Sequence, residues 1–410
     1  MMKNILLIDE HKTVNYAGGV ERVLAAFANA FSSRGYNVAI ACMDAEKGKM
    51  FFPLDSSVRF HNLWYEYGKP FGGVSWFFKK VEKEFLRTFA GAKMTIAGKQ
   101  IKDPKKEYFF RSFIGRLNEL MEDFRPDVIL SITAESAYMA QKACGDNSIP
   151  VIAMCHMEPA REASGYGERE YNAWRNAAWV QILMNSFLSQ MEKFGVRNVV
   201  RIPNFVEQTP DNKTVDLMTP KNKIVTVGRI DGAGKSQHIL IEAFALLAEK
   251  FPEWSVHIYG DIANRRYKHR LEALICKKNL SSRVSFEGTT NRIDEVYQEA
   301  DIFAFPSAYE GFGLALAEAM SAGLPAVGRK SCAAVNELIE DGITGILAEE
   351  GAENFAKALE RLMLDQPLRV RMGHAAHEAV KVYQPEKVWD MWEKVIREVI
   401  REQDFSKEKG

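Results

Sequence analysis

Short apolar runs alternate with helix-period segments along almost all of the 410 residues. In the first half of the chain, the predicted strands are residues 4–8, 37–42, 127–132, 151–154, 180–184 and 199–202. In the second half they are residues 224–227, 255–259, 284–286, 302–305, 325–327 and 345–347. Strands that alternate with helices form parallel sheets covered by helices on both faces. The alternation therefore predicts the α/β fold class.

The chain is long enough for two domains, because a single core stops growing at about 250–300 residues. A polar stretch with two prolines, residues 208–222, separates the two series of strands and is predicted to be a linker. We therefore expect two doubly wound Rossmann-like domains, residues 1–205 and 206–384, that face each other across a cleft. Ligands of such sheets bind beyond the carboxyl ends of the strands, so this cleft is the expected active site.

The balance of charge argues against a nucleic-acid-binding protein, because 54 Lys and Arg face 54 Asp and Glu. The five cysteines are scattered without C-x-x-C spacing, which indicates neither a disulfide framework nor a zinc site. The first apolar run is too short for a signal peptide core, and no run of eighteen apolar residues follows. We expect a cytoplasmic protein, at most peripheral on the inner face of the membrane.

One window, residues 76–116, is strongly basic and rich in aromatic residues. It holds eleven Lys or Arg against four Asp or Glu, together with Trp76 and several phenylalanines. Aromatic rings can enter a membrane interface while Lys and Arg meet anionic lipid phosphates. The window equally fits a pair of amphipathic helices whose aromatic face belongs to the core. Both interpretations remain open at this point.

A glycine-bearing loop follows the first predicted strand of the second half. Gly228 and Arg229 come directly after this strand, and Gly234, Lys235 and Ser236 lead into the next helix. Free backbone N–H groups and the helix dipole make such a loop an anion site. A P-loop would need glycine where Arg229 stands, which excludes that ATPase motif. Arg229 and Lys235 can instead bring two cations to one diphosphate, the alternative being two solvated surface charges.

Two glutamates belong to a second glycine-bearing segment. Glu310 follows another predicted strand, and Gly311 and Gly313 let the backbone approach a ligand closely. Glu318 falls about one and a half turns into the next helix, where a carboxylate can hold a vicinal diol such as a ribose. Either glutamate alone could be an ordinary helix-capping residue. The pair gains weight from Arg229 upstream.

Glu310 and Glu318 stand eight positions apart in the segment EGFGLALAEAMSAGLP. With Arg229 and Lys235 upstream, this segment resembles the signature of retaining glycosyltransferases of family 4, which have the GT-B fold. The resemblance covers nearly the whole chain. Residues 16–23 are similar to the first loop and helix of that family, and residues 155–159 are similar to a loop whose histidine contacts the donor sugar.

The resemblance implies a role for each matching residue. The cationic residues would neutralise the donor diphosphate, Glu318 would hold the nucleoside ribose and Glu310 would bind donor-sugar hydroxyls. The residues expected to act in catalysis are His156, Glu310, Arg229 and Lys235. Those expected to bind the donor are Gly18, Gly19, Gly228, Arg229, Lys235, Glu310, Gly311, Phe312, Gly313, Leu314 and Glu318. The chain departs from the family at Ser236, where glycine usually follows the lysine, and this affects the tightness of the turn.

The implied activity is a hexosyltransferase reaction with retention of configuration. A hexose or N-acetylhexosamine would pass from a nucleoside-diphosphate sugar, a UDP-sugar in preference to a GDP-sugar, to a hydroxyl of a saccharide or lipid-linked saccharide. Cell-surface polysaccharide or glycolipid synthesis is the expected setting. No two aspartates are separated by one residue, so the D-x-D metal motif is missing and we expect neither a metal nor a cofactor.

Three other functions compete with this activity. A nucleotide-sugar epimerase or hydrolase of the same fold would bind the same donor without transfer to an acceptor. A non-catalytic nucleotide-sugar binding protein is disfavoured, because the residues with assigned roles are all present together. A dehydrogenase is disfavoured, because no G-x-G-x-x-G motif follows the first strand.

The end of the chain is predicted to be an amphipathic helix. Trp389, Trp392, Val395, Ile396 and Val399 recur at helical spacing. The family resemblance implies that this helix, over residues 385–405, packs back on the first domain. Packing on the second domain alone is the alternative.

Overall fold

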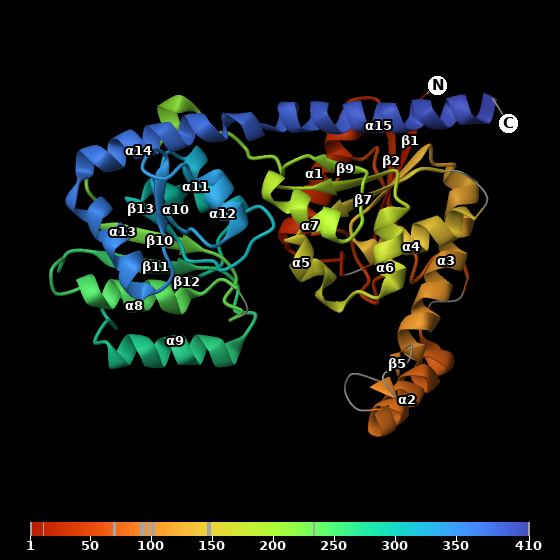
Figure 1. The fold of residues 1–410 in the computed structure, drawn as a ribbon, viewed down its shortest axis with the longest axis horizontal. Helices are drawn as coiled ribbons and strands as arrows, with labels where there is room; N and C mark the ends of the chain where they lie inside the picture. Colours follow the sequence, from red (N-terminus) through yellow and green to blue (C-terminus); the bar gives the residue numbers. More distant parts are fainter. Residues whose placement is uncertain are drawn as a thin grey trace. The chain divides into compact units, whose positions relative to one another are not determined.

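A computed structural model describes residues 2–10, 12–68, 71–90, 95–96, 99–100, 103–145, 149–232 and 234–408. The chain forms two compact units (Figure 1). Unit 1 comprises Met1–Ile182, Gln190–Val200 and Trp389–Gly410, and unit 2 comprises Leu183–Ser189 and Arg201–Val388. The two main stretches meet between Val200 and Arg201, a few residues before the expected boundary at residue 205.

The sheet of unit 1 has seven strands in the order β3-β2-β1-β6-β7-β8-β9. The recorded pairings from β3 to β8 are parallel, with Asn4 opposite Asn37 and Ile5 opposite Val128. The central strands are buried along nearly their whole length, as expected for a sheet covered on both faces. Their bounds are β1 Asn4–Asp9, β2 Asn37–Cys42, β3 Arg59–Asn62, β6 Val128–Ser131, β7 Val151–Cys155, β8 Trp179–Ile182 and β9 Val199–Arg201.

Helices connect these strands, and a short antiparallel pair, β4 (Thr95–Ile96) and β5 (Lys99–Gln100), lies between α2 and α3 in the chain. The helices are α1 Gly19–Ser33, α2 Gly73–Ala90, α3 Pro104–Phe124, α4 Ala134–Cys144, α5 Pro159–Glu162, α6 Glu168–Arg175 and α7 Leu188–Lys193. Two short 3-10 turns are Ala163–Gly165 and Asn185–Phe187. Asp103 caps α3 by accepting from the backbone N–H groups of Lys105 and Lys106.

The sheet of unit 2 has six strands in the order β12-β11-β10-β13-β14-β15, all parallel. This is the strand order of a dinucleotide-binding fold. The strands are β10 Lys223–Val227, β11 Ser255–Tyr259, β12 Val284–Gly288, β13 Ile302–Phe305, β14 Ala326–Arg329 and β15 Gly345–Ala348. Their parallel arrangement and the two sheets confirm the predicted α/β class of two doubly wound units.

The helices of unit 2 cover its sheet, and one core joins α8, α9 and α13 to the strands. The helices are α8 Gln237–Leu247, α9 Arg265–Lys277, α10 Ile293–Gln298, α11 Leu314–Ser321, α12 Ala333–Leu338, α13 Ala352–Leu364 and α14 Gln366–Ala379. Two further 3-10 turns are Asp211–Lys213 and Val380–Tyr383. No helix among the described residues is long and apolar enough to cross a bilayer.

The last helix, α15, runs over Pro385–Glu408, and from Trp389 onward it belongs to unit 1. The rings of Trp389 and Trp392 meet the Phe27 ring of α1 edge to face, with centroids 5.9 and 5.4 Å apart. Arg34 donates to Asp390 at 2.7 Å and to Glu393 at 2.9 Å. The amphipathic stripe that the sequence predicts is therefore buried against the first helix of unit 1.

The stretch predicted as a linker, residues 208–222, is not a free connector. Val215 and Leu217 are buried, and the Val215 N–H donates to the Ala322 carbonyl at 2.8 Å. The Thr209 N–H donates to the Ser321 hydroxyl at 2.9 Å. This segment is therefore attached to unit 2, which its content of proline and polar residues did not predict.

Candidate functional site

The predicted donor residues of unit 2 lie where its two central strands end. β10 and β13 are neighbours in the sheet, although 74 residues lie between the end of β10 at Val227 and the start of β13 at Ile302. The helices that follow these strands, α8 and α11, therefore begin at the same edge of the sheet. Helix N-termini carry unpaired N–H groups and a positive partial charge, so this edge favours an anion.

Lys235 and Glu310 meet at this edge. The Lys235 Nζ lies 2.5 Å from the Glu310 Oε1, and both side chains are partly buried, with 23% and 12% of their surface exposed. The ammonium also lies 5.5 Å from the ring centre of Phe305, the last residue of β13. The structure thus brings together two predicted residues that stand 75 positions apart in the chain.

Arg229 precedes Lys235 in the chain and Glu318 follows Glu310, but neither belongs to the contact between Lys235 and Glu310. Arg229 is the second residue after β10, is exposed, and forms no ion pair with any residue that the structure describes. Its backbone carbonyl accepts from Gln237 Nε2 at 3.0 Å, which ties the loop to the start of α8. Glu318 is the fifth residue of α11, and its Oε2 accepts from the Tyr297 hydroxyl at 3.4 Å. Glu318 is therefore held at the helix surface, with its carboxylate partly exposed.

The turn before α8 keeps its shape without glycine. Ser236 adopts φ +50° and ψ +37°, the left-handed conformation that glycine enters most easily. Its hydroxyl lies 3.3 Å from the Gly234 carbonyl. Serine in place of glycine therefore raises the conformational energy of the turn, and the backbone still adopts the left-handed conformation. Gly313, at the start of α11, uses the same region with φ +92°.

Two of the other expected donor-binding residues belong to unit 1. Gly18 and Gly19 precede and open α1, and a Cβ on Gly18 would lie 2.0 Å from the Glu21 Oε2. Glycine at position 18 thus lets the carboxylate of Glu21, in the first turn, fold against the helix N-terminus. Gly311, Phe312 and Leu314 of unit 2 complete the expected set, and Phe312 is buried edge to face on Tyr383, 5.3 Å between ring centres.

His156 follows β7 directly, at the carboxyl edge of the sheet of unit 1. Burial lowers its pKa to about 4, so the ring is neutral near pH 7. Its Nε2 is buried and has no hydrogen-bond partner among the described residues. A neutral imidazole with an unpaired nitrogen can donate to or accept from a ligand hydroxyl.

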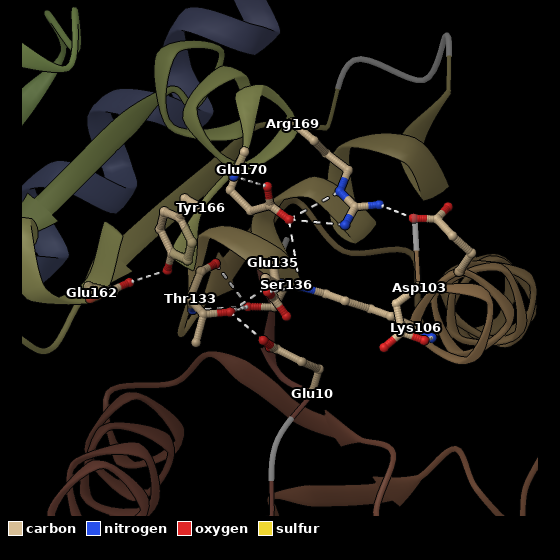
Figure 2. Close-up of polar contacts among 12 residues, drawn as sticks. Glu10, Asp103, Lys106, Thr133, Glu135, Ser136, Glu162, Tyr166, Arg169 and Glu170 are labelled. Carbon is tan, nitrogen blue, oxygen red and sulfur yellow. Dashed lines mark hydrogen bonds and ion pairs between the residues drawn. The ribbon is translucent and has the colours of Figure 1, made fainter. Parts of the chain in front are cut away.

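One carboxyl that escaped the sequence analysis is Glu162, the partly buried last residue of α5. The Glu162 carboxylate accepts from the Tyr166 hydroxyl at 2.9 Å (Figure 2). The Cys155 thiol donates to the Glu162 Oε2 at 3.1 Å. Burial raises the pKa of Glu162 to about 7, and it raises the pKa values of Cys155 and Tyr166 as well. The sequence of residues 155–166 does not indicate that Glu162 is shielded from solvent, because its polar composition is typical of a surface loop.

Glu10 is a second residue that the sequence analysis did not single out. It follows β1 directly and accepts from the Thr133 hydroxyl at 2.6 Å, where Thr133 caps α4 after β6 (Figure 2). A carboxylate at the end of the first strand is a signal that the sequence contains. It went unused because the sequence does not give the strand order, which places β6 beside β1.

Comparison with known proteins agrees with this architecture. The model of the family "Glycosyltransferase Family 4" matches residues 17–209, and the model "Glycosyl transferases group 1" matches residues 207–379. An uncharacterized glycosyltransferase of Haemophilus influenzae is 25% identical over 397 residues, which cover 93% of this chain and 97% of the relative.

Two solved structures are similar over nearly the full length. Sucrose-phosphate synthase from Thermosynechococcus elongatus has a TM-score of 0.75 at 17% identity, covering 97% of this chain and 99% of that chain. The Anabaena protein HepE, in complex with UDP and glucose, has a TM-score of 0.70 at 18% identity, covering 97% and 100%. At these identities the likeness concerns the fold.

Proposed function

Because the chain belongs to glycosyltransferase family 4 and has the GT-B fold, we propose that it transfers a hexose or N-acetylhexosamine from a nucleoside-diphosphate sugar to a hydroxyl. The observation that carries this donor assignment is the contact between Lys235 and Glu310 at the switch point of unit 2. In a nucleotide sugar the diphosphate and the sugar are directly bonded. A cation for the phosphate and a carboxylate for the sugar hydroxyls must therefore be neighbours, as these two residues are.

We propose the remaining roles on the same basis. Arg229 is exposed and available to the outer phosphate, and Glu318 is available to the ribose diol. The N-termini of α8 and α11 add N–H groups for phosphate oxygens. His156, as a neutral ring, would bind a hydroxyl of the donor sugar. A UDP-sugar is the preferred donor, supported by the fold shared with HepE, whose structure holds UDP and glucose.

The proposed reaction retains the anomeric configuration. The bond from the anomeric carbon to the phosphate oxygen breaks, the acceptor oxygen bonds to the same face, and the acceptor proton passes to the departing phosphate. Arg229 and Lys235 stabilise the charge that develops on the leaving diphosphate, as preorganised cations do in other sites. This electrostatic role is one that a metal ion otherwise fills, so we propose that the reaction is metal-independent.

We propose a saccharide or lipid-linked saccharide as the acceptor, met at an anionic membrane surface through residues 76–116. The support is the exposed apolar stripe of α2, where Val74, Phe77, Phe78 and Phe85 each expose more than 60% of their surface. Within this window, residues 91–94, 97–98 and 101–102 and the side chains of residues 89–90, 95–96 and 99–100 lie outside what the structure describes. Synthesis of cell-surface polysaccharide or glycolipid follows from such an acceptor.

The donor assignment is tested by binding and by kinetics. Wild-type protein should be stabilised by UDP in a thermal-shift screen of nucleoside diphosphates, by about 2.7 kcal/mol at one hundred times the dissociation constant. Arg229→Ala and Lys235→Ala should each lower kcat/KM by about a hundredfold or more, because each removes charge stabilisation of the leaving group.

Lys250→Ala is the matched control, since this exposed lysine of unit 2 forms an ion pair with Glu360 and lies over the Phe251 ring. It should keep full activity and UDP binding. Near-normal turnover in both Arg229→Ala and Lys235→Ala would show that the diphosphate is held elsewhere. Rapid turnover of a UDP-sugar without an acceptor would favour a hydrolase or epimerase of the same fold.

A further inference from the structure

Unit 1 has a switch point of its own, between β1 and β6. The chain runs outward from β1 to β3 on one side of the sheet and from β6 to β9 on the other. The loops that follow β1 and β6 therefore part in opposite directions, which leaves a crevice beyond the strand ends. Glu10 and Thr133 lie at this point and are joined by the 2.6 Å hydrogen bond (Figure 2).

A pocket of about 510 Å³ opens at this switch point. Glu10 lines it after β1, Asp44 after β2, and Glu135 from the first turn of α4, while α2 and α3 supply the remaining side. Its volume lies within the range of ordinary small-molecule sites, about 300–1,000 Å³. All of its lining residues belong to unit 1.

The four carboxylates that line the pocket already accept hydrogen bonds from the protein. Glu10 accepts from Thr133, and Asp44 accepts from the Thr13 and Val14 N–H groups at 3.1 Å. Asp103 pairs with Lys83 and caps α3, and Glu135 pairs with Lys106. These carboxylates are therefore stabilised without a ligand.

The lysines of the pocket are not all matched in this way. Four line it, and Lys83 and Lys106 are taken up by the ion pairs with Asp103 and Glu135. Lys12 and Lys105 form no ion pair with any residue in the described part of the chain. Lys105 lies over the Trp76 ring, with its Nζ 4.5 Å from the ring centre. Lys12 and Lys105 can therefore bind an anionic group of a ligand, beside the hydrogen-bonded carboxylates of Glu10 and Asp44.

The rest of the pocket suits a sugar. Trp76, Phe109 and Phe110 contribute aromatic rings to its lining, and Glu10 contributes a carboxylate just after β1. A sugar ring presents apolar C–H faces and a hydroxyl edge, which matches an aromatic wall with a few polar groups. We propose that this pocket binds a phosphate-bearing saccharide, with Lys12 and Lys105 on the phosphate and Glu10 accepting a hydrogen bond from a sugar hydroxyl.

This proposal rests on the proposed function and names its acceptor class: a saccharide linked through a phosphate. Lys105 belongs to α3, which packs against α2, and α2 carries the exposed apolar stripe. A phosphate in the pocket is therefore close in the fold to the element proposed to meet lipid. The same chemistry is found in a free sugar phosphate, which can serve as a probe.

The test uses ligand-observed NMR on the full chain with glucose 1-phosphate, methyl α-glucoside and inorganic phosphate as probes. Glucose 1-phosphate should bind more tightly than either partial probe, because each lacks one of the two groups recognised. The double variant Lys12→Gln, Lys105→Gln should weaken glucose 1-phosphate about tenfold or more, since two charge-assisted contacts are lost. Lys142→Gln, an exposed lysine of α4 outside the pocket, is the matched control and should bind like wild type.

UDP binding is measured in the same samples and separates the two proposals. If UDP fails to stabilise the wild type, the proposed function itself is wrong. If UDP binds but glucose 1-phosphate does not, the pocket proposal alone is overturned. It is also overturned if Lys235→Ala abolishes glucose 1-phosphate binding while the double variant keeps it, because the probe then occupies unit 2. Equal affinity for inorganic phosphate and glucose 1-phosphate would refute the saccharide part.

Discussion

Ser236 shows how a single residue can preserve a turn at an energetic cost. A left-handed conformation costs an L-residue about 1–2 kcal/mol, whereas glycine loses about 0.5–1 kcal/mol through its freer unfolded chain. Ser236→Gly should therefore raise the stability of the protein by up to about 1 kcal/mol, with activity retained because the backbone geometry stays the same. Calorimetric melting measures this change.

Gly313→Ala is the opposite substitution, at φ +92° in the corresponding turn before α11. It should destabilise the protein by about 1 kcal/mol or more, because alanine enters the region that glycine tolerates.

A lower melting temperature for Ser236→Gly would mean that the hydroxyl contact with Gly234 outweighs the backbone strain.

His156 and Glu162 make opposing contributions to the pH dependence of folding. The pKa of His156 falls from 6.5 to about 4 on burial, so its contribution is present above pH 6.5 and is lost as the pH falls towards 4. The pKa of Glu162 rises from 4.5 to about 7, so its contribution is present below pH 4.5 and is lost as the pH rises through 7. Between about pH 4.5 and 6.5 the two slopes oppose each other.

Single variants should expose each slope separately. Glu162→Gln cannot ionise, so the melting temperature should climb more steeply from pH 4.5 to 6.5 than in the wild type. His156→Asn should show the reverse, a decline between pH 4.5 and 7, with about 3 kcal/mol as the upper limit for either group. Parallel pH profiles for wild type and both variants would contradict the assigned pKa shifts.

At the scale of elements, the strands of both sheets were predictable because buried parallel strands are short apolar runs. β3, over Arg59–Asn62, was missed because it lies at the sheet edge and contains Arg, His and Asn. The helix after Gly313 was predicted, and Glu318 lies in α11, over Leu314–Ser321, as expected. The pairing of Lys235 with Glu310 was not derivable, because it depends on β13 lying beside β10, and strand order is a tertiary property.

The structure shows that α2 carries an exposed stripe of apolar side chains. Val74, Phe77, Phe78, Val81 and Phe85 recur at helical spacing, and each exposes about half or more of its surface. These α2 side chains are therefore not part of the core. Within residues 76–116, the core interpretation applies to Phe110 and Phe113 of α3, which are buried. Figure 1 shows α2 at the end of α3 that lies away from the strands of unit 1.

Phe77→Ser with Phe78→Ser should weaken binding to liposomes that contain anionic lipid by about tenfold or more, because two rings no longer enter the interface. Flotation measures bound protein, and added salt should weaken wild-type binding through the basic residues. Leu246→Ser, which replaces an apolar residue of unit 2 that is 57% exposed, is the control and should leave flotation unchanged. If the wild type does not float, a soluble acceptor becomes the better proposal.

For the whole molecule, the proposed donor roles draw on both units. The residues for the nucleotide and diphosphate, from Gly228 to Glu318, belong to unit 2, whereas His156, proposed for the sugar, belongs to unit 1. The parts of a nucleotide sugar should therefore protect different segments from hydrogen exchange. Mass spectrometry of exchange with UDP and with UDP-glucose can separate these contributions.

UDP should slow exchange in residues 228–236 and 306–318, because bound phosphates and ribose hold the two loops and the start of α11. UDP-glucose should add protection in residues 155–158, since only the complete donor carries the sugar hydroxyls that His156 is proposed to bind. In His156→Asn this added protection should shrink while protection of the unit 2 loops persists, because the diphosphate contacts are unaltered. Identical exchange of residues 155–158 with both ligands would remove His156 from the donor site, and absent protection of the unit 2 loops would remove the nucleotide from unit 2.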